Sequence, residues 1–173
     1  MKTGEKKAFN SNITNAKDIK LADIIEGVNG VFHTSSVVYR KEIAFQKYDF
    51  LKCMKGVGDY PKAILMALNG KIRYFPQEMS LYRFASTNTS WTSKNTGKFQ
   101  NGNKIKRVES EVEMLEQLLH ERSEVKKIVQ PAINTKKFNL FVLRGDIKSI
   151  YNDKELWEMY KRTDFKKKIN IIG

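Results

Sequence analysis

Asp59 is the residue of this chain whose surroundings best suit acid–base chemistry. It lies in Gly58-Asp59-Tyr60-Pro61, directly ahead of the nearly continuous apolar run from Ala63 to Leu68. Proline is favoured in the first turn of a helix, where its missing N–H has no intrahelical partner. The pattern therefore places one carboxylate at the start of a predicted helix. Such a carboxylate can serve as a general base, or it can be an ordinary helix N-cap that stabilises the fold by about 1 kcal/mol.

Short elements on both sides of this acid would have to position it. Residues 13–27 have the apolar spacing of an amphipathic helix that stops at Gly27, and β-branched and aromatic residues predict a strand over 31–39. The helix after Asp59 should end at Asn69-Gly70, and two short strands over 71–75 and 78–83 should form a hairpin or an adjacent pair. This pattern predicts an α+β fold with a small mixed sheet and short helices.

The second part of the chain has a different pattern. Residues 85–103 are rich in Ser, Thr, Asn and Gly, which predicts a loop. From Lys104 the pattern is helical, and its first apolar stripe should pack against the rest of the protein (Ile105, Val108, Val112, Leu115, Leu119). Pro131 should interrupt a later helix, Gly145 should separate two more, and Asn152 or Asp153 should cap the last. We therefore expect two regions, 1–103 and a helical extension over 104–173.

Four short motifs carry a resemblance to a known family: His33-Thr34-Ser35-Ser36, Gly58-Asp59-Tyr60-Pro61, Tyr82-Arg83 and Ser90-Trp91-Thr92. In this order they resemble the acceptor-binding half of family 2 glycosyltransferases of the inverting GT-A type. The resemblance covers roughly residues 14 to 92. It implies that Asp59 is the catalytic base, which takes the proton of an acceptor hydroxyl as its oxygen attacks the anomeric carbon.

The resemblance also implies roles for five further residues. His33, Thr34 and Ser35 would face the acceptor, although His33 is equally consistent with a structural histidine. Trp91 would stack on a sugar ring or anchor the polar loop, and Arg83 would meet a phosphate or brace that loop.

Several parts of the family pattern are missing. No two aspartates are spaced i, i+2, so the Asp-x-Asp motif of the nucleotide-binding half has no counterpart. Gly58 stands where relatives often have a second acid, and Ala85 stands where many have a metal-binding histidine. We therefore assign no metal ligand and expect a divalent metal, Mg or Mn, in a full-length parent only. The chain resembles a fragment of a hexosyltransferase that acts on a nucleotide sugar and a glycan or lipid-linked acceptor, as in bacterial surface-polysaccharide synthesis, and alone it should be inactive.

The formal net charge of +13 leaves two other classes of function open. A basic nucleic-acid-binding module would combine this charge with aromatic residues such as Tyr74, Phe75 and Tyr82. The predicted long helix is as acidic as it is basic and no nucleic-acid-binding motif matches, so no nucleic acid is expected. The second alternative is a non-catalytic interaction domain that kept the fold.

The remaining features place the protein in the cytoplasm. Cys53 is the single cysteine, and the N-terminal residues lack the apolar core of a signal peptide. No run reaches the ~20 apolar residues that span a bilayer. A peripheral contact with the inner face of the membrane is compatible with the basic charge and with a lipid-linked acceptor.

Overall fold

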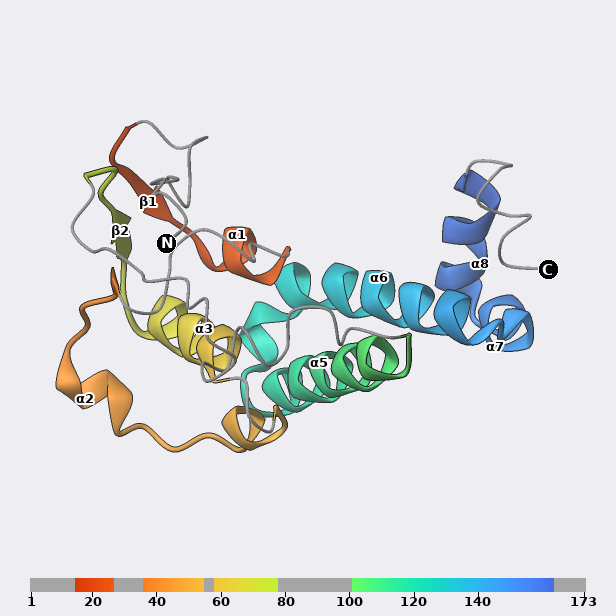
Figure 1. Cartoon of the computed structure of the whole chain (residues 1–173), viewed down its shortest axis with the longest axis horizontal. Helices are drawn as coiled ribbons and strands as arrows, with labels where there is room; N and C mark the ends of the chain where they lie inside the picture. The colour runs from red at the N-terminus through yellow and green to blue at the C-terminus, as the bar shows by residue number, and fades with distance from the viewer. Residues whose placement is uncertain (1–14, 27–35, 55–57, 78–100, 164–173) are drawn as a thin grey trace, which may run out of the picture. The chain divides into compact units, whose positions relative to one another are not determined.

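The computed structural model describes residues 15–26, 36–54, 58–77 and 101–163 (Figure 1). Within these ranges the secondary structure is mostly helical, with one antiparallel sheet of two strands, which is compatible with the α+β class. The chain divides into two compact units. The described residues of the first unit are 15–26, 36–47 and 58–77, and those of the second are 48–54 and 101–163.

The described residues of the first unit form the sheet and the helices α1, α2 and α3. Strands β1 (Lys17–Ile19) and β2 (Ile72–Tyr74) pair antiparallel, with Asp18 opposite Arg73. These two side chains form an exposed ion pair with a distance of 2.9 Å. Helices α1 (Leu21–Ile25) and α2 (Lys41–Ala44) each contact α3 (Asp59–Asn69). A sheet of two strands is marginal in water by itself, so the unit depends on buried apolar side chains for its stability.

Two expectations for this unit need correction, and the predicted pairing of 71–75 with 78–83 stays a prediction. The predicted helix over 13–27 is wrong at its start, because Lys17–Ile19 pairs with β2 and the helix begins only at Leu21. The Asp23 carboxylate accepts the Lys20 backbone N–H at 2.8 Å and fixes that start. The predicted strand over 31–39 is wrong in its described part, because residues 36–39 pair with no described strand. The described partner of β2 is β1, and residues 78–83 lie outside the described residues.

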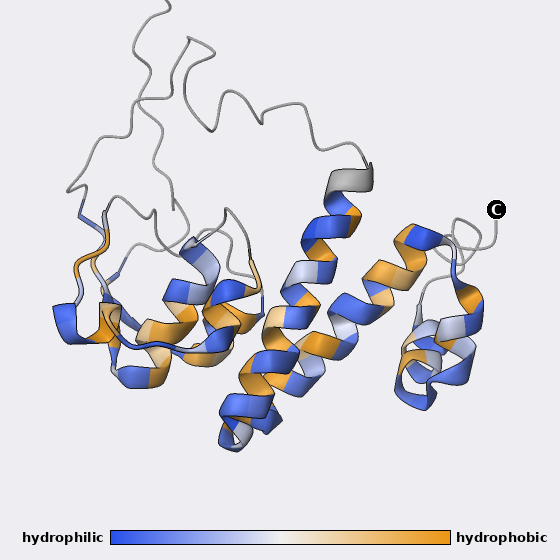
Figure 2. Ribbon diagram, turned by 90° about the horizontal axis from the view of Figure 1, so that it is seen from below, coloured by the Kyte–Doolittle hydropathy of each residue, from blue (hydrophilic) through white to orange (hydrophobic). Residues whose placement is uncertain are grey.

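The secondary structure in the described residues of the second unit is helical. A 3₁₀ helix, η2 (Asp49–Lys52), packs against α5 (Asn101–Glu121), and a short 3₁₀ turn, η3 (Ser123–Val125), leads into α6 (Lys126–Arg144). Helices α7 (Ile147–Asn152) and α8 (Lys154–Arg162) follow. Helices α5 and α6 pack against each other, and both ribbons carry hydrophobic stretches where they come together (Figure 2). The buried apolar residues of the two helices are Val112, Met114, Leu115, Leu118, Val129, Ile133, Phe138 and Leu140.

The predicted stripe of α5 is confirmed in part. Val112 and Leu115 are buried, but Met114 and Leu118 take the other fully buried positions, whereas Ile105, Val108 and Leu119 are only half-buried. The helix begins at Asn101, inside the predicted loop over 85–103, and residues 85–100 of that loop lie outside the described ranges.

Pro131 does not interrupt its helix, contrary to the prediction. Helix α6 runs through it from Lys126 to Arg144. A proline inside a helix removes one hydrogen bond and costs about 3 kcal/mol. Burial of Val129 and Ile133 on either side offsets this cost, because tertiary packing supplies most of the stability of a helix in a protein.

Two predicted helix boundaries are confirmed. Gly145 ends α6 with a left-handed backbone (φ 67°), and its N–H and that of Asp146 bond back to Val142 and Phe141. Asp153 caps α8, since its carboxylate accepts the N–H groups of Glu155 and Leu156 at 2.9 and 3.1 Å.

Two long-range hydrogen bonds anchor the segment 48–54 to α5. The two carboxylate oxygens of Glu121 accept the backbone N–H groups of Asp49 and Phe50 at 2.7 and 3.3 Å, and Phe50 is fully buried. Cys53 follows in the same segment. Its burial, together with the charges of Glu113, Glu121 and Asp49, raises the pKa of the thiol above its usual 9.0.

We expect Glu121→Ala to loosen this segment. The loss of a charged acceptor for two N–H groups should lower the free energy of unfolding by about 1 kcal/mol and raise the alkylation rate of Cys53 about fivefold. Thermal melting and iodoacetamide labelling would measure both. Glu113→Ala is the matched control, because Glu113 acts on the thiol only through its charge. Equal labelling rates in the two variants would contradict the anchoring role.

Asp146 gives α7 a pH-dependent cap. The hydroxyl of Ser149 donates to Asp146 Oδ2 at 2.6 Å and its N–H donates to Oδ1 at 3.1 Å, and these bonds lower the pKa of the carboxyl below 3.8. A carboxyl whose pKa is lower in the folded state stabilises the fold above its unfolded pKa. This contribution is lost as the pH falls through the folded value.

Asp146→Asn should therefore lower the melting temperature at pH 7, and the difference from the unmodified protein should shrink below about pH 3.8. Circular dichroism melts from pH 7 to pH 2 would test this. A difference that stays constant over the whole range would show that the charge of Asp146 contributes nothing.

Candidate functional site

Asp59 is the first residue of α3, and its side chain is exposed. Gly58 occupies the N-cap position with ordinary helical angles (φ −84°, ψ −11°). The alternative interpretation of Asp59 as the N-cap residue is therefore wrong. Its carboxylate projects from the first turn of the helix, which is where the sequence predicted it.

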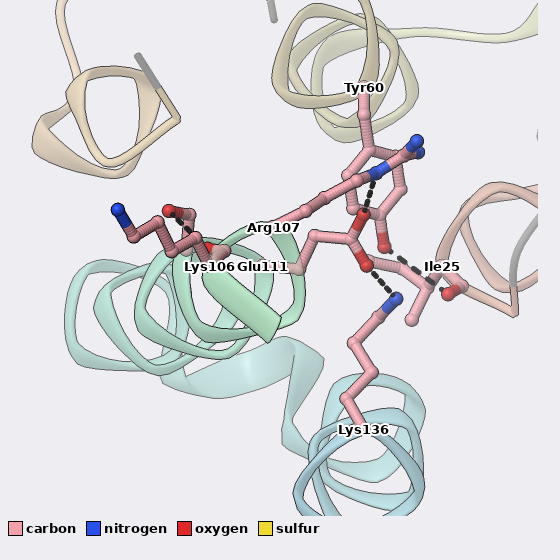
Figure 3. A network of polar contacts seen from close by, with 7 residues as sticks. Ile25, Tyr60, Lys106, Arg107, Glu111 and Lys136 are labelled. Atoms are coloured by element: carbon pink, nitrogen blue, oxygen red, sulfur yellow. Dashed lines mark hydrogen bonds and ion pairs between the residues drawn. The ribbon is translucent and has the colours of Figure 1, made fainter. Parts of the chain in front are cut away.

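Two features hold the first turn of α3 in place. The hydroxyl of Tyr60, the residue after Asp59, donates to the carbonyl oxygen of Ile25 at the end of α1, at 3.2 Å (Figure 3). Pro61, the third residue of the helix, is fully buried, and the apolar residues that follow it are buried as well (Ala63, Ile64, Leu65). The exposed carboxylate thus lies on a turn whose other side is fixed.

Lys62 brings a positive charge to the same turn. Its Nζ lies 3.7 Å from the point that a Cβ at residue 58 would occupy. A side chain at position 58 would therefore meet Lys62 in ordinary van der Waals contact. In the resembled family this position often holds a second acid. Sequence reasoning missed Lys62. Its spacing of i, i+3 from Asp59, which puts both on one side of the helix, was the available signal.

The other predicted site residues lie outside the described residues: His33, Thr34, Ser35, Arg83 and Trp91. Their roles stay predictions. Of the candidate set, the structure places Asp59 alone.

The described residues do not fit a metal site. Within 15–26, 36–54, 58–77 and 101–163, no three side chains of His, Cys, Asp or Glu gather as metal ligands would. Asp59 therefore has no described partner for binding the divalent metal expected in a full-length parent, and we derive no step of a reaction through it.

A second polar cluster, in the second unit, is structural. Glu111 of α5 is only 8% exposed, and its carboxylate accepts from Arg107 Nε at 3.0 Å and from Lys136 Nζ of α6 at 2.5 Å (Figure 3). A buried carboxylate needs such partners, because an unpaired charge in a protein interior costs several kcal/mol. The cluster thus ties α5 to α6 and leaves the acid no free oxygen for catalysis.

Comparisons with protein-family models, with curated proteins and with solved structures found no match to this chain. Among the described residues, no helix is long and apolar enough to cross a membrane.

Proposed function

We propose that this chain supplies the acceptor side of an inverting family 2 glycosyltransferase of the GT-A type, with Asp59 as the catalytic base. The observation that carries the proposal is the exposed carboxylate on the first residue of a helix whose other face is buried. The resemblance predicts the base at this position. The motifs at His33, Tyr82 and Trp91 support the same assignment.

The proposed reaction is a single displacement. The oxygen of an acceptor hydroxyl attacks the anomeric carbon of a nucleotide-bound hexose, and the bond to the nucleoside diphosphate breaks on the opposite side with its electron pair. The hydroxyl proton passes to a carboxylate oxygen of Asp59. General base catalysis of this kind contributes about 10² to 10⁴ in rate. The configuration at the anomeric carbon is inverted, because attack and departure occur on opposite faces.

The acceptor would be a glycan or a lipid-linked sugar on the cytoplasmic side of a bacterial membrane. His33, Thr34, Ser35 and Trp91 would contact it, and Arg83 would meet a phosphate of the donor. The nucleotide and its divalent metal would bind to a region beyond these 173 residues, since the chain has no Asp-x-Asp motif. The proposed activity thus belongs to the assembled enzyme.

The purified chain should have no transferase activity on its own. Without a nucleotide-binding region there is no donor to attack, so the release of nucleoside diphosphate from common sugar nucleotides should stay at the uncatalysed level. A coupled assay with increasing amounts of chain would measure this. Turnover in proportion to the chain concentration would contradict the proposal that the nucleotide binds outside these residues.

Asp59→Asn should strongly slow transfer in the assembled enzyme and leave the fold intact. Asparagine has nearly the same shape but cannot take a proton from a hydroxyl, so the rate should fall by about 10² or more. The free energy of unfolding should change by less than about 1 kcal/mol, because the side chain is exposed. Product formation by mass spectrometry and thermal melting would be measured together.

Glu26→Gln is the matched control, because it neutralises another exposed carboxylate of the same unit. It should transfer sugar at the normal rate. Near-normal transfer by the Asp59 variant would refute the assignment of the base, and equal losses in both variants would indicate a general effect of charge.

A further inference from the structure

Three large apolar side chains are exposed within eight residues of the first unit. Val38 is 98% exposed, Tyr39 46% and Phe45 74%. They lie before and after the four-residue helix α2, in a stretch without a described strand. We call residues 38–47 the exposed segment. Single exposed apolar residues are normal on a protein surface, but three so close together in sequence indicate a surface that contacts something apolar.

The same segment is rich in positive charge. Arg40, Lys41 and Lys47 are all exposed, and Glu42 is its one acidic residue. Aromatic and aliphatic side chains interleaved with Lys and Arg are typical of segments that lie in the interface of a membrane. There the rings and methyl groups enter the headgroup region while the cations stay at the surface. Anionic lipids attract each cation within about one Debye length.

We propose that the exposed segment is a reversible contact site for an anionic lipid surface. Charge complementarity favours an anionic lipid surface over other partners. Three cations against one acid, in a chain of net charge +13, match a negative bilayer. The centre of a protein interface is instead depleted of Lys. Single-stranded nucleic acid binds by stacking on aromatic rings, and Val38, the most exposed side chain of the segment, cannot stack.

This contact goes beyond the proposed transfer reaction and does not depend on it. It fixes where the chain acts, and it uses none of the predicted acceptor residues. Lipid vesicles contain neither a sugar nucleotide nor an acceptor, so a negative result with them leaves the role of Asp59 unaffected.

Binding of the full chain to vesicles tests the proposal. With vesicles of phosphatidylcholine and phosphatidylserine, we expect sedimentation of the chain that weakens steeply as salt is raised. Vesicles of phosphatidylcholine alone should bind little of it. The double variant Val38→Ser/Phe45→Ser should lower the partition coefficient about tenfold, since both apolar contacts are lost. The triple variant Arg40→Gln/Lys41→Gln/Lys47→Gln should do the same and lose most of the salt dependence.

Matched controls come from the second unit. Tyr151 is 66% exposed, so Tyr151→Ser removes an equally exposed aromatic residue and should leave binding unchanged. Lys104→Gln/Lys106→Gln/Lys154→Gln removes the same number of exposed cations and should weaken binding less than the triple variant of the exposed segment.

A second measurement locates the contact without relying on loss of binding. In a Cys53→Ser background, an environment-sensitive dye on Val38→Cys should shift to the blue when anionic vesicles are added, whereas the same dye on Tyr151→Cys should not. The proposal is overturned if the chain ignores anionic vesicles, if the dye responds only at position 151, or if both triple variants lose binding equally. Oligonucleotides that bind more tightly than the vesicles in physiological salt would overturn it in favour of a nucleic-acid partner.

Discussion

Burial of one face of α3 is the constraint on which the candidate site depends. A free helix of this length is marginal in water, so its position is set by the packing of Pro61, Ile64 and Leu65 and not by helix propensity. The hydrogen bond from Tyr60 to α1 adds direction, because it fixes the turn that carries the neighbouring Asp59. A general base works only within hydrogen-bond reach of its proton. In the proposed reaction, the buried residues of α3 would therefore hold the exposed carboxylate of Asp59 within reach of its proton.

The sequence predicts those elements whose signal is local. Pro61 in a first turn, Gly145 at a helix end and Asp153 as a cap each act through one or two neighbouring groups, and the structure confirms all three. Strand β1 could not be predicted in this way, because its hydrogen bonds go to Ile72–Tyr74, far along the chain. The prediction that Pro131 interrupts a helix is wrong for the same reason. The local cost of this proline is outweighed by the burial of its neighbours, which depends on α5.

Charged residues show the same limit. In the sequence, Glu111 and Glu121 are two of several acids on an amphipathic helix. In the structure, one is buried between two cations and the other accepts two backbone N–H groups of a segment about seventy residues away. For the candidate site, the sequence predicted that Asp59 would stand at a helix start. It could not show that Gly58 is the N-cap, nor that Lys62 folds back to the same turn.

The proposed base and the proposed lipid contact belong to one unit, and α2 of the exposed segment contacts α3, which begins with Asp59. This matters for an acceptor that is itself held in a membrane. In the proposed reaction, a weak attachment to the bilayer would confine the assembled enzyme and a lipid-linked acceptor to the same thin layer, and the resulting effective concentration would replace binding energy that the site otherwise needs. The attachment must also be weak, because a permanently inserted segment would hold product and enzyme together. Three cations and three exposed apolar side chains suit such a contact, since the attraction of the cations depends on salt and on lipid charge.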